Sequence, residues 1–311
     1  MVPKARLKQT IMENVAPRSS LSTLSCRSWA VADATTGALV DSCNLEEEVL
    51  IASVTKVMTA LVVLKAIEYS GAGGLDEILE CSASAASVVG TSAKLRAGDR
   101  LTVRDLLHGM LLPSGNDAAT LLAEHFGALE FCASVIGEPM RAGESSSGYD
   151  RFVQAMNAFG SGTLGMTRTV FRNPHGLTTP APLATTSCAS DVVRMCVAAW
   201  TFPTLREIVG ARRYVASCER VADSGPARSV VSLRFVNTNA LLGASADDRI
   251  SWTCDGLKTG WTRRAGGCLT THVTCAGGQE LIVVTLGSRN KMRRFVDNKA
   301  VLQHGYAQRQ R

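Results

Sequence analysis

Hydrophobic and polar residues alternate in two separate parts of the chain, one near each end. Residues 28–42, SWAVADATTGALVDS, alternate on both sides of a Thr-Thr-Gly turn, which is the pattern of a β-hairpin. Three more strands are predicted at residues 256–262, 266–274 and 281–287, and an Ala-Gly-Gly-Gln turn joins the last two. A final helix is expected to start near Arg289.

Apolar residues at helical spacing dominate the region between these strands. Residues 52–68, ASVTKVMTALVVLKAIE, predict an amphipathic helix whose first turn carries Ser53 and Lys56. The segment TVRDLLHGML begins with a helix cap at Thr102 and Asp105 and is expected to stop at the next proline. Another helix, DAATLLAEHF, starts directly after the loop Pro-Ser-Gly-Asn.

Strands at both ends of the chain with helices between them favour an α+β fold. We expect one antiparallel sheet built from the N- and C-terminal strands, with flanking helices and a mostly helical inserted subdomain at about residues 75–210. Residues 1–25 read as a leader or a disordered N-terminus, so a single domain is predicted over residues 26–305, with no β-rich domain after it. Gly- and Ser-rich segments at residues 137–150 and 243–252 predict surface loops.

The composition of the 311 residues, 46% hydrophobic and 19% charged, is that of a globular protein. The formal charge is +6, but no Lys/Arg block with interleaved aromatic residues predicts nucleic-acid binding. Lys65 interrupts the longest apolar run, so no transmembrane segment is expected. The N-terminus lacks the apolar core of a secretory signal. Its basic residues and single acid, Glu13, are compatible with an organelle transit peptide, so the sequence does not assign a localisation.

Ten cysteines are spread along the chain without CxxC pairs, and HExxH is absent. No metal site and no cofactor are therefore expected. Cys26 and Cys43 flank the predicted hairpin and could form a disulfide, although unpaired buried cysteines are the commoner case.

Two residues of the predicted first helix, Ser53 and Lys56, share a helix face because they are three positions apart. A hydroxyl that touches a neutral amine is an activated nucleophile, whereas one beside a charged amine is only a polar patch. Ser-x-x-Lys alone is a weak signal, since Ser288 and Lys291 form a second copy. Ser53 could also simply cap the helix.

Order and context separate one set of motifs from chance matches. Ser-x-Asn occurs three times, yet only the copy at Ser114–Asn116 lies on a predicted loop between two helices. A Lys-Thr-Gly triplet, Lys258–Gly260, then lies on a predicted strand, and Ser288 has no such triplet after it. The ordered set favours Ser53 as a nucleophile and Lys56 as its base.

With these motifs the sequence resembles the penicillin-recognising serine peptidases, and specifically the low-molecular-mass D-alanyl-D-alanine carboxypeptidases. Class A β-lactamases share the three-part arrangement. The resemblance covers about residues 29–300 and implies a β-lactamase/transpeptidase-like fold. It extends over several segments in family order, namely DATTGALV, SVTKVMTALVVL, KLRAGDRLTVRDLLHGMLLPSGNDAATLLAEHFG, LGMTRTVFRNPHGL, NTNALL and DGLKTGWT.

The resemblance implies a role for each residue of the motifs. Lys56 can be the base only if it is neutral, and burial together with the like charge of Lys258 would lower its pKa. The N–H groups of Ser53, at a helix N-terminus, and of Trp261 would stabilise an oxyanion. Ser114 is implied to transfer a proton to the leaving amine. The residues implied for substrate binding are Asn116, Lys258, Thr259, Gly260 and Trp261.

The function implied is a serine-type D-Ala-D-Ala carboxypeptidase that removes a terminal D-Ala from peptidoglycan-type peptides through an acyl-enzyme on Ser53, with β-lactams as covalent inhibitors. A β-lactamase-like hydrolase is one alternative, but it would need Ser-Asp-Asn and a Glu-x-x-Leu-Asn-like loop, and the chain has Ser-Gly-Asn and no such glutamate. A catalytically idle binding protein on the same scaffold is the other alternative, which the intact motifs disfavour.

The chain departs from the family pattern in a few places. Ile51 stands where relatives commonly have proline two residues before the nucleophile, which affects local rigidity more than chemistry. The predicted loops at residues 137–150 and 243–252 are longer than usual, and ten cysteines are unusual for an enzyme of the bacterial envelope. His175, in NPHGL, matches a family segment and is expected to have a structural loop role.

Overall fold

The computed structural model describes residues 21, 23–70, 74–137, 147–178, 184–222, 227–243, 245–247 and 250–309. Most of the expected leader, residues 1–20 and 22, lies outside the described residues, as does most of the predicted loop at 137–150. Within the described part, the Ser25 hydroxyl donates a 2.6 Å hydrogen bond to Asp297 near the other end of the chain.

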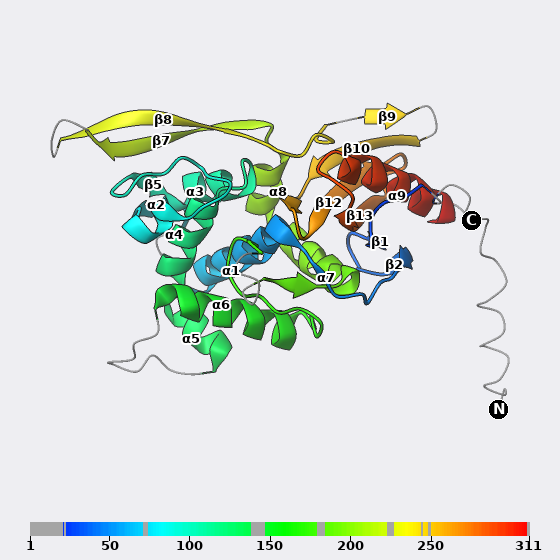
Figure 1. Cartoon of the computed structure of the whole chain (residues 1–311), viewed down its shortest axis with the longest axis horizontal. Coiled ribbons are helices and arrows are strands. Elements are labelled where there is room, and N and C mark those ends of the chain that lie inside the picture. Colours follow the sequence, from blue (N-terminus) through cyan, green and yellow to red (C-terminus); the bar gives the residue numbers. More distant parts are fainter. Residues whose placement is uncertain are drawn as a thin grey trace.

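The central seven-stranded sheet joins the two ends of the chain, which confirms the α+β prediction (Figure 1). Its order is β2-β1-β13-β12-β10-β9, and β11 pairs with β12. The N-terminal β1 pairs antiparallel with the C-terminal β13 over its whole length. The bounds are β1 Ser28–Asp33, β2 Leu39–Cys43, β9 Ser245–Asp247, β10 Ile250–Gly256, β11 Thr259–Thr262, β12 Gly266–Cys275 and β13 Glu280–Ser288.

Helices cover this sheet because its central strands are apolar on both faces. Almost every residue of β12 and β13 is buried. Helix α7, Ala189–Trp200, packs against β1 and β13, and α9, Arg293–Arg309, packs against β12 and β13. Helix α9 is the predicted final helix, and it begins four residues after Arg289 because Asn290 turns the chain there by accepting the N–H groups of the next turn.

The first long helix, α1, is buried on nearly all sides rather than amphipathic. It spans Thr55–Ser70, and all of its first ten residues are buried among the helices around it. A 3-10 turn, η2 (Ala52–Val54), precedes it. The other helices are α2 Ala83–Ser87, α3 Val103–Leu111, α4 Asn116–Phe126, α5 Glu130–Ile136, α6 Gly148–Ala158 and α8 Pro203–Gly210, with η3 Gly74–Asp76 and the π-helical turn η4 Phe159–Thr163.

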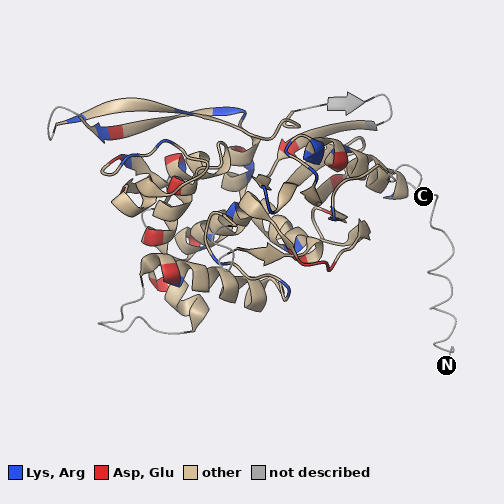
Figure 2. Ribbon diagram, viewed as in Figure 1, with Lys and Arg blue, Asp and Glu red and all other residues tan. Residues whose placement is uncertain are grey.

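A second sheet of four strands, in the order β4-β5-β7-β8, was not predicted from the sequence. Its strands are β4 Ile78–Glu80, β5 Arg100–Thr102, β7 Arg213–Val221 and β8 Arg228–Val236, and a two-stranded sheet pairs β3 Val49–Leu50 with β6 Thr186–Ser187. The β7–β8 hairpin runs along one side of the helices (Figure 1) and carries Lys or Arg on both strands (Figure 2). The loop predicted at 243–252 also contains strand, because β9 pairs with β10 there.

The predicted helix cap at Thr102 and Asp105 is present as a full capping box at the start of α3. Helix α3 ends at Leu111, two residues before Pro113, and α4 begins at Asn116. The short connection between them is tight, because a Cβ on Gly115 would lie 2.7 Å from the carbonyl oxygen of Gly109. This turn places the Ser-Gly-Asn motif beside α1.

All ten cysteines are free, including Cys26 and Cys43 at the ends of the hairpin. In the described part of the chain, no single helix has both the length and the apolar character needed to cross a membrane. The pair α4 and α5, bent by 81°, passes such a test by length and composition together.

Candidate active site

Ser53 lies in the 3-10 turn before α1, not in the first turn of the α-helix. The expected helix start at Ala52 is wrong because Ala52 has a left-handed backbone, with φ of 46°, and α1 begins at Thr55. Gly176 fixes this turn from the other side, since a Cβ there would lie 1.9 Å from the carbonyl oxygen of Ala52. Ser53 itself is half-buried at the start of the helix.

Lys56 is completely buried and has three oxygen neighbours. Its Nζ lies 3.0 Å from Ser53 Oγ, 2.7 Å from Asn116 Oδ1 and 2.8 Å from the carbonyl oxygen of His175. Burial, and after it the positive charge of Lys258, lower the pKa of Lys56 well below its ordinary value, while Asp117 opposes the shift.

A neutral Lys56 has two N–H donors and one lone pair. The oxygens of Asn116 and His175 can only accept, and the Asn116 amide is oriented by a second bond, from its Nδ2 to the Val89 carbonyl. Both N–H groups are thereby used. The lone pair of Nζ is left for the Ser53 hydroxyl, which is the arrangement in which an amine can remove its proton.

Ser114 lies next to this group on the tight turn between α3 and α4. Its backbone is left-handed, with φ of 69°, and its carbonyl oxygen accepts a 2.6 Å hydrogen bond from the Thr91 hydroxyl. Within the described residues its own hydroxyl makes no hydrogen bond to Lys56 or Lys258. Asn116, the first residue of α4, keeps one N–H of its amide available beyond the bond to Val89.

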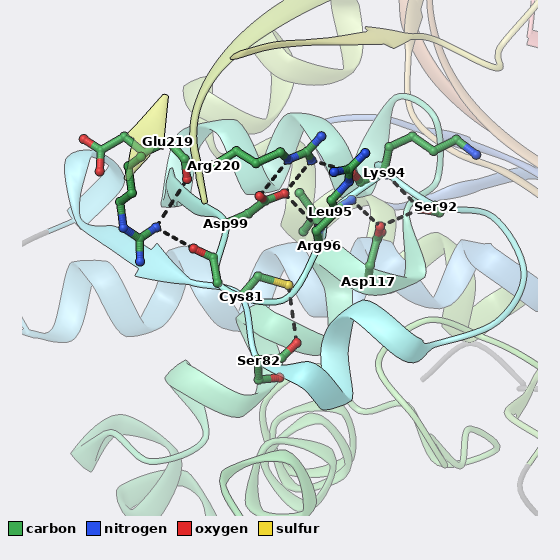
Figure 3. Close-up of polar contacts among 12 residues, drawn as sticks. Cys81, Ser82, Ser92, Lys94, Leu95, Arg96, Asp99, Asp117, Glu219 and Arg220 are labelled. Atoms are coloured by element: carbon green, nitrogen blue, oxygen red, sulfur yellow. Dashed lines mark hydrogen bonds and ion pairs between the residues drawn. The ribbon is translucent and has the colours of Figure 1, made fainter. Parts of the chain in front are cut away.

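Asp117 organises the loop behind Asn116, and sequence reasoning missed it. Its buried carboxylate accepts hydrogen bonds from the N–H groups of Ala93 and Leu95 and from the Ser92 hydroxyl, at 2.8, 3.2 and 2.6 Å (Figure 3). The only sequence signal is an acidic residue in the first turn of α4, where it also suits the helix dipole.

A second acidic residue, Asp99, ties the same loop to the β7–β8 hairpin (Figure 3). Its buried carboxylate binds Arg220 of β7 through two bonds of 2.8 and 2.6 Å, and it accepts the N–H of Arg96. Arg220 also donates to the Lys94 carbonyl. The β7–β8 hairpin therefore supports the loop at residues 92–99, and this loop holds the Ser-Gly-Asn motif through Asp117.

Strand β11 brings the Lys-Thr-Gly motif against the Ser53 turn. A Cβ on Gly260 would lie 2.9 Å from the Ile51 carbonyl oxygen and 3.2 Å from Ser53 N, so only glycine permits this approach. Lys258 exchanges both backbone hydrogen bonds with Thr270 of β12. Because such pairs alternate along antiparallel strands, the N–H of Trp261 points away from β12, toward the free edge.

Lys258 is the second completely buried lysine of the site. Burial, and after it the charge of Arg294, lower its pKa to about 7. Its Nζ donates a 3.0 Å bond to the Thr259 carbonyl, and the Thr259 hydroxyl lies 2.7 Å from that of Thr238. Arg294 and Thr238 were not predicted from the sequence. Arg294 holds β11 by donating to the Gly260 carbonyl at 2.8 Å.

His175 has the structural loop position expected for it. Its backbone carbonyl accepts from Lys56, and its ring nitrogen accepts the N–H of Leu177. Burial and the neighbouring Lys56 lower the pKa of His175 to about 3, so the ring is neutral at ordinary pH.

The second Ser-x-x-Lys forms no comparable pair. Ser288 is fully buried in β13, whereas Lys291 is exposed on the following turn and lies over the Trp261 ring.

Backbone strain collects at the three motifs. Three described residues other than glycine that have positive φ lie at the motifs. Ala52 and Leu257 directly precede the Ser-x-x-Lys and Lys-Thr-Gly motifs, and Ser114 is the first residue of Ser-Gly-Asn. Left-handed backbone at such residues costs on the order of 1–3 kcal/mol each and persists only where the surrounding structure enforces it. The arrangement can support nucleophilic attack by a serine on a carbonyl, next to buried positive charge that attracts an anion.

Comparisons with known proteins agree with this chemistry. The sequence model of the family described as D-alanyl-D-alanine carboxypeptidase matches residues 13–130 and 141–290. A D-alanyl-D-alanine endopeptidase from Pseudomonas aeruginosa is 32% identical over 281 residues, which cover 88% of this chain and 75% of that protein. The D-alanyl-D-alanine carboxypeptidase DacF from Bacillus subtilis is 27% identical, and the match covers 88% of this chain but 60% of that relative.

Solved structures resemble the fold over nearly its whole length. The Streptomyces K15 DD-transpeptidase superposes with a TM-score of 0.74 at 26% identity, covering 94% of this chain and all of that one. Penicillin-binding protein D2 from Listeria monocytogenes, in its ampicillin-bound form, gives a TM-score of 0.67 at 25% identity, with 95% of this chain and all of that one covered. The chain belongs to the D-alanyl-D-alanine carboxypeptidase family of serine peptidases.

Proposed function

We propose that the protein is a D-Ala-D-Ala carboxypeptidase that works through an acyl-enzyme on Ser53. The observation that carries the proposal is the 3.0 Å contact between the fully buried Lys56 Nζ and Ser53 Oγ, beside two other oxygens that can only accept. Once the amine is neutral, those two oxygens take its N–H groups and its lone pair is left for the Ser53 hydroxyl. The low pKa of the buried amine supports the same protonation state.

In the proposed reaction, Ser53 Oγ attacks the carbonyl carbon of the penultimate D-Ala while its proton passes to Lys56 Nζ. The N–H groups of Ser53 and Trp261 stabilise the oxyanion. The C–N bond then breaks, and the terminal D-Ala leaves with a proton delivered through the Ser114 hydroxyl. Water hydrolyses the acyl ester and restores Ser53.

Substrate binding in this proposal uses the groups around the nucleophile. Asn116 donates its remaining N–H to the peptide backbone, and Gly260 keeps β11 close enough to the nucleophile for the substrate to lie along the strand. Lys258 and the Thr259 hydroxyl bind the terminal carboxylate, which distinguishes a carboxypeptidase substrate from an internal peptide bond. The missing partner for the buried Lys258 charge supports this role, because no carboxylate among the described residues bonds to it.

Labelling with a fluorescent penicillin tests the acyl-enzyme. We expect a stable covalent label on the wild-type protein and none on Ser53→Ala. Ser288→Ala is the matched control, because it removes the serine of the second Ser-x-x-Lys, and its label should equal that of wild type. Persistent labelling of Ser53→Ala would exclude Ser53 as the nucleophile. A transient label would favour a β-lactamase, and no label an idle scaffold.

Release of free D-Ala from a peptide ending in D-Ala-D-Ala tests the proposed reaction itself. A cross-linked peptide without a free terminal carboxylate serves as the comparison, since two of the relatives are named endopeptidases. We expect cleavage of the peptide with the free carboxylate. Preference for the cross-linked peptide would make the protein an endopeptidase.

A further inference from the structure

The proposed function fixes the direction in which a substrate lies along β11, and the inference below rests on it. The terminal carboxylate is assigned to Lys258 and Thr259, and the scissile carbonyl to the N–H of Trp261. These positions follow one another along the strand. The acyl side of the substrate, which carries the rest of the peptide, must therefore continue past Trp261 toward the end of β11.

Exposed basic residues follow Trp261 directly, and the next acidic residue along the chain is Glu280. Arg263 and Arg264 come directly after β11, and both are exposed. Lys291 joins them from the turn before α9, with its Nζ 4.6 Å from the centre of the Trp261 ring. We call Arg263, Arg264 and Lys291 the basic rim.

The position of Lys291 is fixed by backbone packing. Trp261 lies opposite Gly267 in the pairing of β11 with β12. A Cβ on Gly267 would lie 2.5 Å from the carbonyl oxygen of Asn290, so the turn that carries Lys291 packs directly on this part of the sheet. The Asn290 side chain accepts the N–H groups of Met292 and Arg293 and so orders the turn.

The charges of the basic rim are not neutralised by the protein. Within the described residues, Arg263 and Lys291 form no ion pair, and Arg264 donates to the Thr178 carbonyl at 2.6 Å rather than to a carboxylate. The nearest acidic residue along the chain from Lys291, Asp297, is buried and bound to Ser25 and Arg293. A cluster of exposed positive charge beside the acyl side of the site attracts negative charge.

We propose that the basic rim binds a carboxylate on the acyl side of the substrate, so that the enzyme prefers peptides with an acidic group shortly before the scissile bond. Arg263 is the first residue of the turn that follows β11, two residues past Trp261, so it lies at the end of the strand. A substrate extended beside β11 brings its first or second acyl residue to this end of the strand. The rim thereby selects among peptides that all end in D-Ala-D-Ala.

Two synthetic peptides test the proposal, both ending in D-Ala-D-Ala. One carries a free carboxylate one or two residues before the scissile bond, and the other carries the neutral amide at that place. We expect wild-type kcat/KM to be higher for the acidic peptide. The double variant Arg263→Gln/Lys291→Gln should lose about three- to tenfold in kcat/KM on the acidic peptide and less than about twofold on the neutral one, as two exposed charges would.

Arg234→Gln is the matched control, because Arg234 is an exposed arginine on the β7–β8 hairpin without an ion pair among the described residues, and both peptides should be cleaved as by wild type. The wild-type preference should also shrink when ionic strength rises from about 0.05 to 0.5 M, since salt screens exposed charges.

Penicillin labelling of each variant separates this inference from the proposed function. Absence of labelling and of D-Ala release in wild type would refute the proposed function and the rim with it. Normal labelling with equal kcat/KM for the two peptides, or equal losses on both in the double variant, would overturn the basic rim alone.

Discussion

Two fully buried lysines, Lys56 and Lys258, lie in one site, and the protonation state of each has a different consequence. In the proposed reaction, Lys56 must be neutral to accept the Ser53 proton, whereas Lys258 must be charged to bind a carboxylate. Burial lowers both pKa values, that of Lys258 to about 7. The same low-polarity surroundings therefore help one role and oppose the other.

The pH dependence of kcat/KM should follow from these opposite requirements. Activity on a D-Ala-D-Ala peptide should rise at low pH as Lys56 loses its proton. It should fall above a pH of about 7 as free Lys258 becomes neutral and binds the carboxylate less well. Bound carboxylate favours charged Lys258, so kcat at saturation should fall only at higher pH. Rates from pH 5 to 10 check this, and a flat kcat/KM between pH 7 and 10 would contradict it.

Lys258→Gln should change both the ascending and the descending limb of the pH profile of kcat/KM. Without the positive charge, KM for the peptide should rise, and the fall above pH 7 should disappear. The neighbouring charge also lowers the pKa of Lys56, so its removal should move the ascending limb to higher pH.

Replacement of Lys56 by arginine should nearly abolish acylation, because a guanidinium keeps its proton throughout this range. Loss of a general base typically costs about 10²- to 10⁴-fold. Lys65→Arg is the control, since Lys65 lies on the same helix but pairs with Glu68 at the surface. The rate of labelling by a fluorescent penicillin measures both variants. A Lys56→Arg rate near that of wild type would require another proton acceptor.

At the scale of elements, the turn between α3 and α4 depends on the carboxylate of Asp117. In Asp117→Asn, one of the two oxygens becomes an N–H donor and faces donors from the 92–95 loop. We expect the free energy of unfolding to fall by roughly 2–4 kcal/mol, because a buried bond to a charged group is lost and a donor is left without a partner.

The same substitution should leave a second signature that a purely structural role would not produce. The Asp117 charge raises the pKa of Lys56, so the ascending limb of the acylation profile should move to lower pH in Asp117→Asn. Asp76→Asn, at an exposed aspartate, is the control for both measurements. Denaturant unfolding and the pH profile together check the prediction, and an unchanged limb would place Asp117 outside the electrostatics of the site.

Elements with local signals could be predicted from the sequence, whereas those that depend on distant contacts could not. The first hairpin, the strands of the C-terminal part and the cap at Thr102 each follow from neighbouring residues. The β7–β8 hairpin was not predicted, although Asp-Ser-Gly-Pro at residues 223–226 is a turn signal, because its place in the fold depends on Arg220 binding Asp99, 121 residues earlier. The left-handed backbone of Ala52 arises likewise from packing against Gly176, which no local pattern reports.

At the scale of the whole molecule, the burial of the cysteines determines their reactivity. Eight of the ten are buried, Cys26 is half-buried with a pKa raised to about 12 by burial, and Cys43 is exposed. Because the thiolate is the reactive form, a brief treatment of the native protein with iodoacetamide should modify Cys43 alone. Intact mass should show one adduct, against ten after unfolding in denaturant. Cys43→Ser should then show none, and several rapid native adducts would contradict the buried arrangement.

The pairing of β1 with β13 has a consequence for how the protein is made. Strand β1 leaves the ribosome long before β13 has been synthesised. Until then the backbone N–H and C=O groups on that edge of β1 have no partner strand and can pair with other chains. Contacts this distant along the chain are also slow to form. The Ser53 turn meets Gly260 only after β11 has been synthesised, so a nascent chain cannot become reactive toward a peptide until translation has passed Thr262.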